Sequence, residues 1–143
     1  MADAVSHILS EAGCVVLRNE AVDVYGLSIG GVDDLWSGRA RWGPWLAALK
    51  SPALMLCHNP DACDLPGWTG YEGWILAGHT HGGQCRPPFL PPPILPVRNK
   101  RYTAGTFELS QGRTLYINRG LGHLLRVRFN VRPEVTVFEL ARA

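Results

Sequence analysis

Residues 75–84 read ILAGHTHGGQ. The apolar run at residues 74–77 predicts a short buried strand that ends just before the histidines. His79 and His81 are separated by one residue, so an extended or turning backbone can direct both rings at a common point. Neutral imidazole is a good ligand for zinc, iron, nickel and copper. The stretch therefore predicts a metal site at the end of a buried strand.

Glycines stand on both sides of these histidines, at positions 78, 82 and 83. Glycine tolerates positive φ and lets the backbone pass close to an ion or a phosphate. The alternative is a surface loop that merely contains histidines, because His-x-His alone is a weak signal. The position at the end of a buried strand favours the metal site over that alternative.

Five motifs resemble one known family. GHTHGGQ at residues 78–84 resembles the last signature of the calcineurin-like metallophosphoesterases, and LMLCHNPD at residues 54–61 resembles the signature before it. Downstream, YINRGLG at residues 116–122 and RPE at residues 132–134 are similar to the closing strands of its bacterial YkuE/YaeI-like branch. GVDD at residues 31–34 fits the same branch. The resemblance covers nearly the whole chain, with the motifs in the family's order.

The resemblance implies a hydrolase that acts on a phosphomonoester or phosphodiester through two divalent metal ions, which would be Mn, Zn or Fe. By the matching positions, His58 and His79 would ligate one ion and His81 the other. His79 is also the expected catalytic residue. Asn118 and Arg119 lie at a predicted strand end and are candidates for binding the substrate phosphate. A structural hydrogen-bonding role fits these two residues equally well.

The chain departs from the family in its first half. Three family blocks, Asp-x-His, Gly-Asp and Gly-Asn-His, occur nowhere in the sequence. The resemblance assigns the carboxylate shared by both ions to these blocks, and three neutral imidazoles cannot neutralise two dications. We therefore expect residues 1–143 to be a single partial domain, the C-terminal half, that is weak or inactive alone. Ligands from outside the chain, in a complementing N-terminal half, would complete it.

Two other functions stay open. The first is a catalytically inactive truncated domain that binds metal or a partner. The second is a structural zinc protein that uses Cys63 and Cys85 with the histidines, although these spacings fit no standard zinc knuckle. The two-metal site predicts two ions per completed site, whereas a structural zinc site predicts one tetrahedral ion with cysteine ligands.

The fold class implied by the resemblance is α/β, as the C-terminal half of a four-layer αββα sandwich, made mostly of strands with short helices. The residues themselves predict a helix at 42–50, a strand at 22–29, a hairpin joining 103–109 to 114–118, and a final strand at 135–140. Such a half would leave sheet edges and an apolar face open. Open edges invite pairing, so we expect a homo-oligomer, strand exchange or a complementing half.

Composition indicates a globular protein. The 143 residues are 46% hydrophobic and 18% charged, which excludes a disordered chain, and no apolar run approaches the ~20 residues of a membrane helix. Four cysteines without a CxxC pair, and no visible secretory signal, favour free thiols. The expected location is the cytoplasm, with membrane association open for a longer parent.

Charge is uneven, with nine basic and three acidic residues from position 98 onward. This pattern is typical of a solvated face, or of a basic surface for a phosphorylated substrate or anionic lipid. The proline-dense stretch at residues 86–97 is either polyproline II against the domain or an apolar lip near the metal site. A lip would allow peripheral membrane contact through residues 86–101. We expect no nucleic-acid partner, because interleaved aromatics and binding motifs are missing from the sequence.

Overall fold

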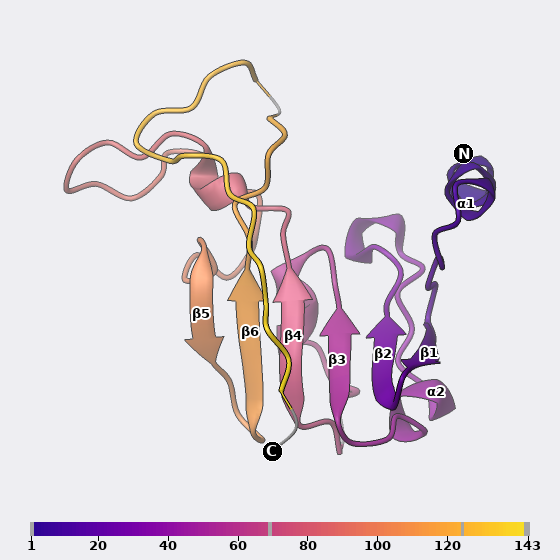
Figure 1. The fold of residues 1–143 in the computed structure, drawn as a ribbon. Coiled ribbons are helices and arrows are strands. Elements are labelled where there is room, and N and C mark those ends of the chain that lie inside the picture. Colours follow the sequence, from indigo (N-terminus) through magenta and orange to yellow (C-terminus); the bar gives the residue numbers. More distant parts are fainter. Residues whose placement is uncertain (1, 69, 124, 142–143) are drawn as a thin grey trace.

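The computed structural model describes residues 2–68, 70–123 and 125–141. Its centre is a mixed sheet with the strand order β1-β2-β3-β4-β6-β5 (Figure 1). The six strands are β1 (Glu20–Val24), β2 (Leu27–Gly31), β3 (Ala53–Leu56), β4 (Gly73–Ala77), β5 (Gly105–Glu108) and β6 (Arg113–Ile117). The four inner strands are parallel, and β1 and β5 pair antiparallel at the two edges. The predicted α/β fold class is confirmed.

The helical elements are short. They are α1 (Ala2–Glu11), η1 (Leu35–Ser37), α2 (Pro44–Ala47), η2 (Pro60–Asp64) and η3 (His81–Gly83). The helix α1 lies beyond β1 at one side of the molecule, and it buries none of its residues (Figure 1). In the part of the chain that the structure describes, no helix has the length and apolar character needed to cross a membrane.

The helix α2 is shorter than predicted. Pro44 occupies its first turn as expected, but the helix spans four residues instead of the predicted range 42–50. The Lys50 amide donates to the Ser28 hydroxyl instead of to a helical carbonyl, so the chain has left the helix before Pro52 restricts the residue that precedes it. The helix supplies Leu46 to the core.

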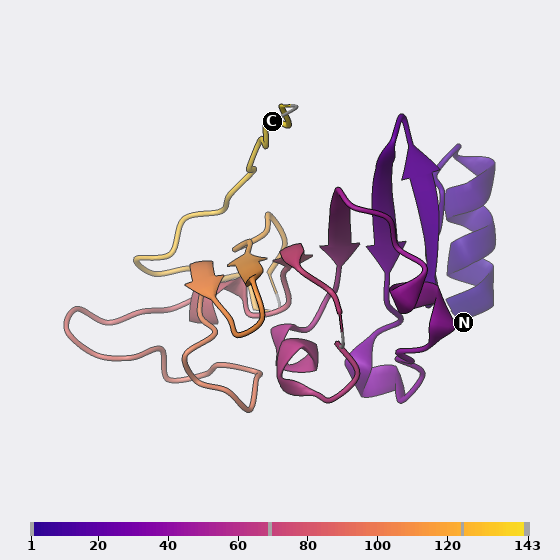
Figure 2. The ribbon, with the colours of Figure 1, turned by 90° about the horizontal axis from the view of Figure 1, so that it is seen from below.

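The two faces of the sheet are covered unequally. On one face Met55, Ile75 and Leu115, from neighbouring strands β3, β4 and β6, are completely buried. Side chains from α2 and η2 pack in the same core. On the other face Leu56 is 40% exposed and Trp74 is 44% exposed. Figure 2 shows the short helices and loops on one side of the sheet and the C-terminal segment on the other.

The C-terminal segment crosses the open face instead of joining the sheet, so the predicted final strand at residues 135–140 is wrong (Figure 1). Its alternation is real: Thr136 lies against Tyr116 at 2.8 Å between hydroxyl oxygens, whereas Val137 is 89% exposed. The Phe138 ring contacts the ring of Trp74. The orientation is opposite to what an apolar inner face would give, since Thr136 faces the sheet and Val137 faces away, and no described strand pairs with the backbone of residues 135–140.

Of the other two β predictions, one is confirmed and one is wrong. The hairpin of β5 and β6 is confirmed, with Glu108 opposite Thr114 next to the turn. The single strand predicted at residues 22–29 is wrong, because a turn at Tyr25 and Gly26 splits it into β1 and β2. Both turn residues have positive φ, as a two-residue hairpin turn of the primed type requires.

Candidate functional site

Two parallel strands bring His58 and His79 to the same edge of the sheet. β3 and β4 are neighbours in register, and each histidine follows the carboxyl end of its strand by two residues. The backbone pairing continues past the strands, because the Gly78 amide donates to the His58 carbonyl at 3.1 Å. The carboxyl edge of a parallel sheet is the usual place for a functional site in open α/β folds.

The rings of His58 and His79 converge. Nε2 of His58 lies 3.2 Å from Nδ1 of His79, and the ring centroids are 5.0 Å apart. Two imidazole nitrogens bound to one tetrahedral ion at ~2.0–2.1 Å are about 3.3 Å apart. The pair therefore has the spacing of two ligands on one ion, and the same distance also suits a hydrogen bond between the rings.

A backbone carbonyl fixes the tautomer of His79. Its Nε2 lies 2.9 Å from the Pro96 carbonyl oxygen, which only accepts, so this nitrogen carries the proton in the neutral ring. The lone pair is then on Nδ1, the atom that faces His58. Metal-ligating histidines almost always donate their second nitrogen in this way. Trp36 adds a packing contact, with its ring edge-on to His79 at 4.4 Å between centroids.

His81 is oriented by a second carbonyl. Its Nδ1 lies 3.1 Å from the Gly122 carbonyl oxygen, which leaves Nε2 as the lone-pair nitrogen. The Arg128 guanidinium is farther from this Nδ1, at 3.4 Å, and it only donates, so the carbonyl is the better partner. Both His79 and His81 have positive φ, 67° and 51°. Such backbone is uncommon for non-glycine residues and is frequent at functional sites.

The glycines after His81 allow another loop to come close. A Cβ on Gly83 would lie 2.2 Å from Cβ of Pro92, and a Cβ on Gly82 would lie 2.8 Å from a methyl group of Val131. Both glycines also have positive φ. Glycine is thus required where the histidine loop meets the proline-dense loop at residues 86–97 and the C-terminal segment.

The electrostatic setting keeps His58 neutral. Burial, followed by the neighbouring His79, lowers the pKa of His58 below its usual value, and Asp34 opposes this in part. The neutral ring is the form that binds a metal.

The described residues do not complete a metal site by themselves. Within residues 2–68, 70–123 and 125–141, no three or more His, Cys, Asp or Glu side chains gather so that they could hold an ion. His58 and His79 have the spacing of two ligands of one ion. His81 lies in the same loop as His79, and its lone pair is on Nε2. The ligand roles of the three histidines stay a prediction.

Nearby carboxylates are engaged in structural contacts. Asp33 pairs with Arg18, and Asp34 caps η1 by accepting from the Ser37 amide at 2.9 Å. Asp61 is buried and accepts from the backbone amides of Arg98 and Asn99. These carboxylates therefore act as a helix cap, an ion-pair partner and a loop anchor in this structure.

The cysteines do not support the structural zinc alternative. Cys14, Cys57, Cys63 and Cys85 are all free thiols. Burial raises the pKa of Cys57, and it raises that of Cys63 to about 12. Among the described residues, neither Cys63 nor Cys85 belongs to a group of three or more side chains that could hold an ion.

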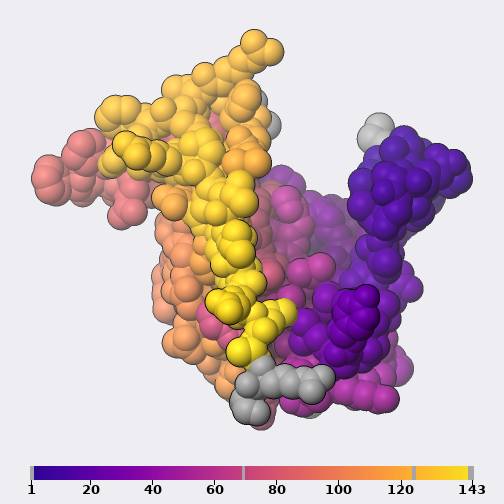
Figure 3. Space-filling view, in the orientation of Figure 1, coloured from indigo at the N-terminus to yellow at the C-terminus, as the bar shows by residue number. Residues whose placement is uncertain are grey.

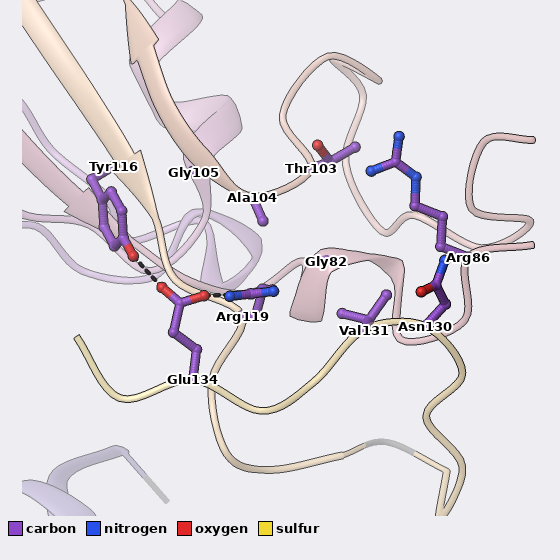
Figure 4. Close-up of a pocket in the computed structure, with 10 residues that line it drawn as sticks. All are labelled: Gly82, Arg86, Thr103, Ala104, Gly105, Tyr116, Arg119, Asn130, Val131 and Glu134. Atoms are coloured by element: carbon purple, nitrogen blue, oxygen red, sulfur yellow. Dashed lines mark hydrogen bonds and ion pairs between the residues drawn. The ribbon is translucent and has the colours of Figure 1, made fainter. Parts of the chain in front are cut away.

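Asn118 and Arg119 are held by the C-terminal segment. The Asn118 amide donates to Oγ1 of Thr136 at 2.9 Å, and its oxygen accepts from the Gly120 amide at 2.6 Å. Arg119 pairs with Glu134, which also accepts from Tyr116 (Figure 4). The structural role allowed for both residues is therefore present, and substrate binding by them stays a prediction.

Sequence reasoning missed Trp36 and Arg128. Trp36 contacts His79 from 43 positions upstream, and only the tertiary fold brings the two together. The Arg128 Nη2 donates to the carbonyls of Arg119 and Gly122, so it fixes the loop that orients His81. The excess of arginine after position 98 was the available signal for Arg128, and it did not distinguish this arginine from the others.

Comparison with known proteins finds several metallophosphoesterases that are similar to this chain. It is 39% identical to phosphodiesterase YaeI of Escherichia coli over 95% of this chain and 51% of YaeI. It is 35% identical to metallophosphoesterase YkuE of Bacillus subtilis over 93% of this chain and 49% of YkuE. UDP-2,3-diacylglucosamine pyrophosphatase LpxG of Chlamydia muridarum is 33% identical over 60% of this chain and 28% of LpxG.

The chain spans about half the length of YaeI and YkuE. That coverage is consistent with the C-terminal half of the enzyme domain, as the order of the motifs implies. No model of a known protein family matches the chain. No solved structure matches it either.

Proposed function

This chain is a homologue of half of the metallophosphoesterases YaeI and YkuE, and we propose that it supplies one side of a two-metal phosphoesterase site. The reaction is the hydrolysis of a phosphomonoester or phosphodiester. Two divalent ions, Mn, Zn or Fe, would clamp the phosphate and activate a water molecule in the completed site. The observation that carries the proposal is the 3.2 Å separation of the His58 and His79 nitrogens at the carboxyl edge of the sheet.

The residues of this chain would bind and orient. His58 and His79 hold one ion, with His79 directed by the Pro96 carbonyl, and His81 holds the other through Nε2. His79 is the proposed catalytic residue because the family resemblance gives it that role, and it contacts the rings of both His58 and Trp36. Asn118 and Arg119 are weaker candidates for contact with the phosphate.

The remaining ligands come from outside this chain in this proposal. Neutral imidazoles leave the charge of two dications uncompensated, and carboxylates usually supply that compensation in oxygen- and nitrogen-rich sites. The open sheet face, where Leu56 and Trp74 are exposed, offers a place for a complementing N-terminal half. A second copy of the chain is the other candidate for covering this face.

Complementation tests this function. The purified chain is mixed with the first half of YkuE or YaeI, and hydrolysis of bis-p-nitrophenyl phosphate is followed with manganese or zinc. We expect little or no turnover by either half alone and turnover by the mixture. His79→Ala abolishes it, whereas His7→Ala, on the exposed helix α1, leaves it unchanged. Turnover by the pure chain that survives His79→Ala would contradict the proposal.

A second candidate function is a catalytically inactive module that binds metal or a partner. The observation that favours it is that the described side chains include no group of three or more metal ligands. The same experiment separates the two, because an inactive module binds the other half or the metal and yields no turnover in the mixture.

The substrate class is open between soluble and lipid-linked phosphates. LpxG, which is similar to 60% of this chain, is named for a diacylated sugar nucleotide, so a lipid-linked phosphate ester is a reasonable substrate to test. Peripheral membrane contact through residues 86–101 belongs to the same proposal. We propose no nucleic-acid partner.

A further inference from the structure

An apolar cavity of about 270 Å³ opens beside the site histidines. His79 and His81 form part of its wall, and most of the remaining wall is apolar. The apolar side chains are Trp36, Pro93, Ile94, Pro96, Leu125 and Val127.

Three separate segments supply the apolar side chains of this cavity, and the histidine loop supplies the rest. Trp36 comes from η1, the prolines and Ile94 come from the loop at residues 86–97, and Leu125 and Val127 come from the segment before the C-terminal crossing. Figure 3 shows this loop and the following segment, in salmon and orange-yellow, gathered at one end of the molecule. The cavity therefore depends on the tertiary fold.

Hydrogen bonds fix the segments that line the cavity, and they occupy backbone carbonyl groups of these segments. The Gln84 amide donates to the carbonyls of Leu125 and Val127 at 3.0 and 2.9 Å. The Pro96 carbonyl accepts from His79, and Lys100 Nζ donates to the carbonyls on either side of Pro96. With these carbonyls occupied, the walls offer a ligand mainly hydrocarbon.

The apolar walls are exposed as well as clustered. Trp36, Ile94 and Leu125 are 66%, 67% and 60% exposed, and they lie around one opening. Contiguous exposed apolar surface of this kind usually marks a binding site. The polar end of the same cavity is formed by His79 and His81, two of the proposed metal ligands.

We infer that this cavity receives the alkyl or acyl chain of a phosphorylated amphiphile, whose phosphate lies at the proposed metal site beside His79 and His81. The inference rests on the proposed function and names its substrate class. A methylene group takes about the volume of a water molecule, ~30 Å³, so the cavity holds roughly nine methylenes. Fully burying one methylene should strengthen binding about four-fold.

A series of alkyl phosphates tests the inference. Ethyl to dodecyl phosphate is titrated into the full chain by calorimetry, with and without zinc, below the concentration at which micelles form. Affinity should rise by up to about four-fold per methylene and level off near nine carbons. Affinity that ignores chain length, or that keeps rising through dodecyl phosphate, would overturn the cavity as the binding site.

Matched variants locate the chain. Ile94→Asp and Leu125→Asp should each weaken octyl phosphate binding at least ten-fold. Leu90→Asp is the control, because Leu90 lies in the same loop and is 60% exposed but does not line the cavity. Equal losses in Leu90→Asp and Ile94→Asp would overturn the inference, since they would indicate non-specific adhesion of the loop.

A fluorescence measurement does not depend on these charged substitutions. An alkyl phosphate with a terminal bromine should quench tryptophan emission, and Trp36→Phe should remove most of that quenching, because Trp36 lines the cavity. Quenching that is unchanged in Trp36→Phe would place the chain elsewhere and overturn the inference.

Octanol separates this inference from the proposed function. Binding of octanol as tight as that of octyl phosphate would overturn the placement of the phosphate, whereas the phosphoesterase proposal would be overturned only by the complementation experiment. Hydrolysis of short phosphate esters by the complemented protein, without any dependence on chain length, would overturn this inference alone.

Discussion

The covered and open faces of the sheet are made from alternate residues of the same strands, yet they differ in burial. Met55 and Ile75 are completely buried, whereas Leu56 and Trp74, one position away in each strand, are 40% and 44% exposed. All four are large and apolar, as in parallel sheets that are covered on both sides. The strands carry large apolar side chains on both faces of the sheet. Within the described residues, short helices and loops bury one of these faces, and the other face is only partly covered.

The largest expected effect concerns association of the open face. Covering an apolar patch of ~400 Å² is worth on the order of 10 kcal/mol before the costs of association. Sedimentation at micromolar concentration should therefore find an associated species. Leu56→Lys combined with Trp74→Lys should shift it to one chain mass, whereas Tyr25→Lys, at a fully exposed turn, should not. A compact wild-type monomer that binds no hydrophobic dye would contradict the comparison.

The next effect compares the same substitution on the two faces. Leu115→Ala, at a fully buried position, should lower the free energy of unfolding by about 2–5 kcal/mol. Leu56→Ala, on the open face, should cost less than about 1 kcal/mol. Urea unfolding measures both. In the dissociated chain, equal losses would mean that the open face is already covered within one molecule, and they would contradict the difference between the faces.

A smaller loss of unfolding free energy is expected when a polar contact on the covered side of the sheet is removed. Asp61 in η2 is 7% exposed and accepts from the amides of Arg98 and Asn99 at 2.6 and 3.0 Å. Asp61→Ala leaves these amides without their carboxylate, so the free energy of unfolding should fall by about 1–3 kcal/mol. Glu139→Ala, in the exposed C-terminal segment, is the control. Unfolding curves that superimpose for the two variants would show that the hydrogen bonds to Asp61 add no stability.

The smallest effect is a pH dependence on the open face. Desolvation raises the pKa of Glu134, but hydrogen bonds from Tyr116 and Thr136 and the contact with Arg119 outweigh it, so the net pKa is lowered. The folded carboxylate therefore binds a proton less readily than the unfolded one. The stability it adds is present above the ordinary glutamate pKa of about 4.3 and is lost as the pH falls below it.

Thermal unfolding between pH 7 and 3.5 measures this dependence. Glu134→Gln should flatten the acid limb of the stability curve, while Glu139→Gln, which has no such contacts among the described residues, should keep it. Identical acid limbs for wild type and Glu134→Gln would show that the contact adds no stability.

The sequence predicted best what depends on neighbouring residues. The buried strand at residues 74–77 and the β5–β6 hairpin are both found, because apolar runs and a glycine-containing turn determine them locally. The final strand failed because strand pairing needs a neighbour that the alternation at residues 135–140 does not specify. The strand at residues 22–29 failed because the turn at Gly26 was hidden in an apolar run.

Part of the candidate site was also predictable from the sequence, and part of it was not. Sequence motifs singled out His58 and His79, and the parallel pairing of β3 and β4 then brings them within 3.2 Å. Trp36 and the carbonyl of Pro96 could not be found from the sequence, because each reaches His79 through a loop whose path depends on the whole fold. Carbonyl groups carry no sequence signal.

Zinc titration tests the central claim, that the histidines at the strand ends form a metal site. Calorimetry on the purified chain should find binding that weakens at least about ten-fold in His58→Ala and in His79→Ala. His7→Ala, on the exposed helix α1, should bind as the wild type does. Equal affinity in His79→Ala and His7→Ala, or affinity lost only when cysteines are replaced, would contradict the account.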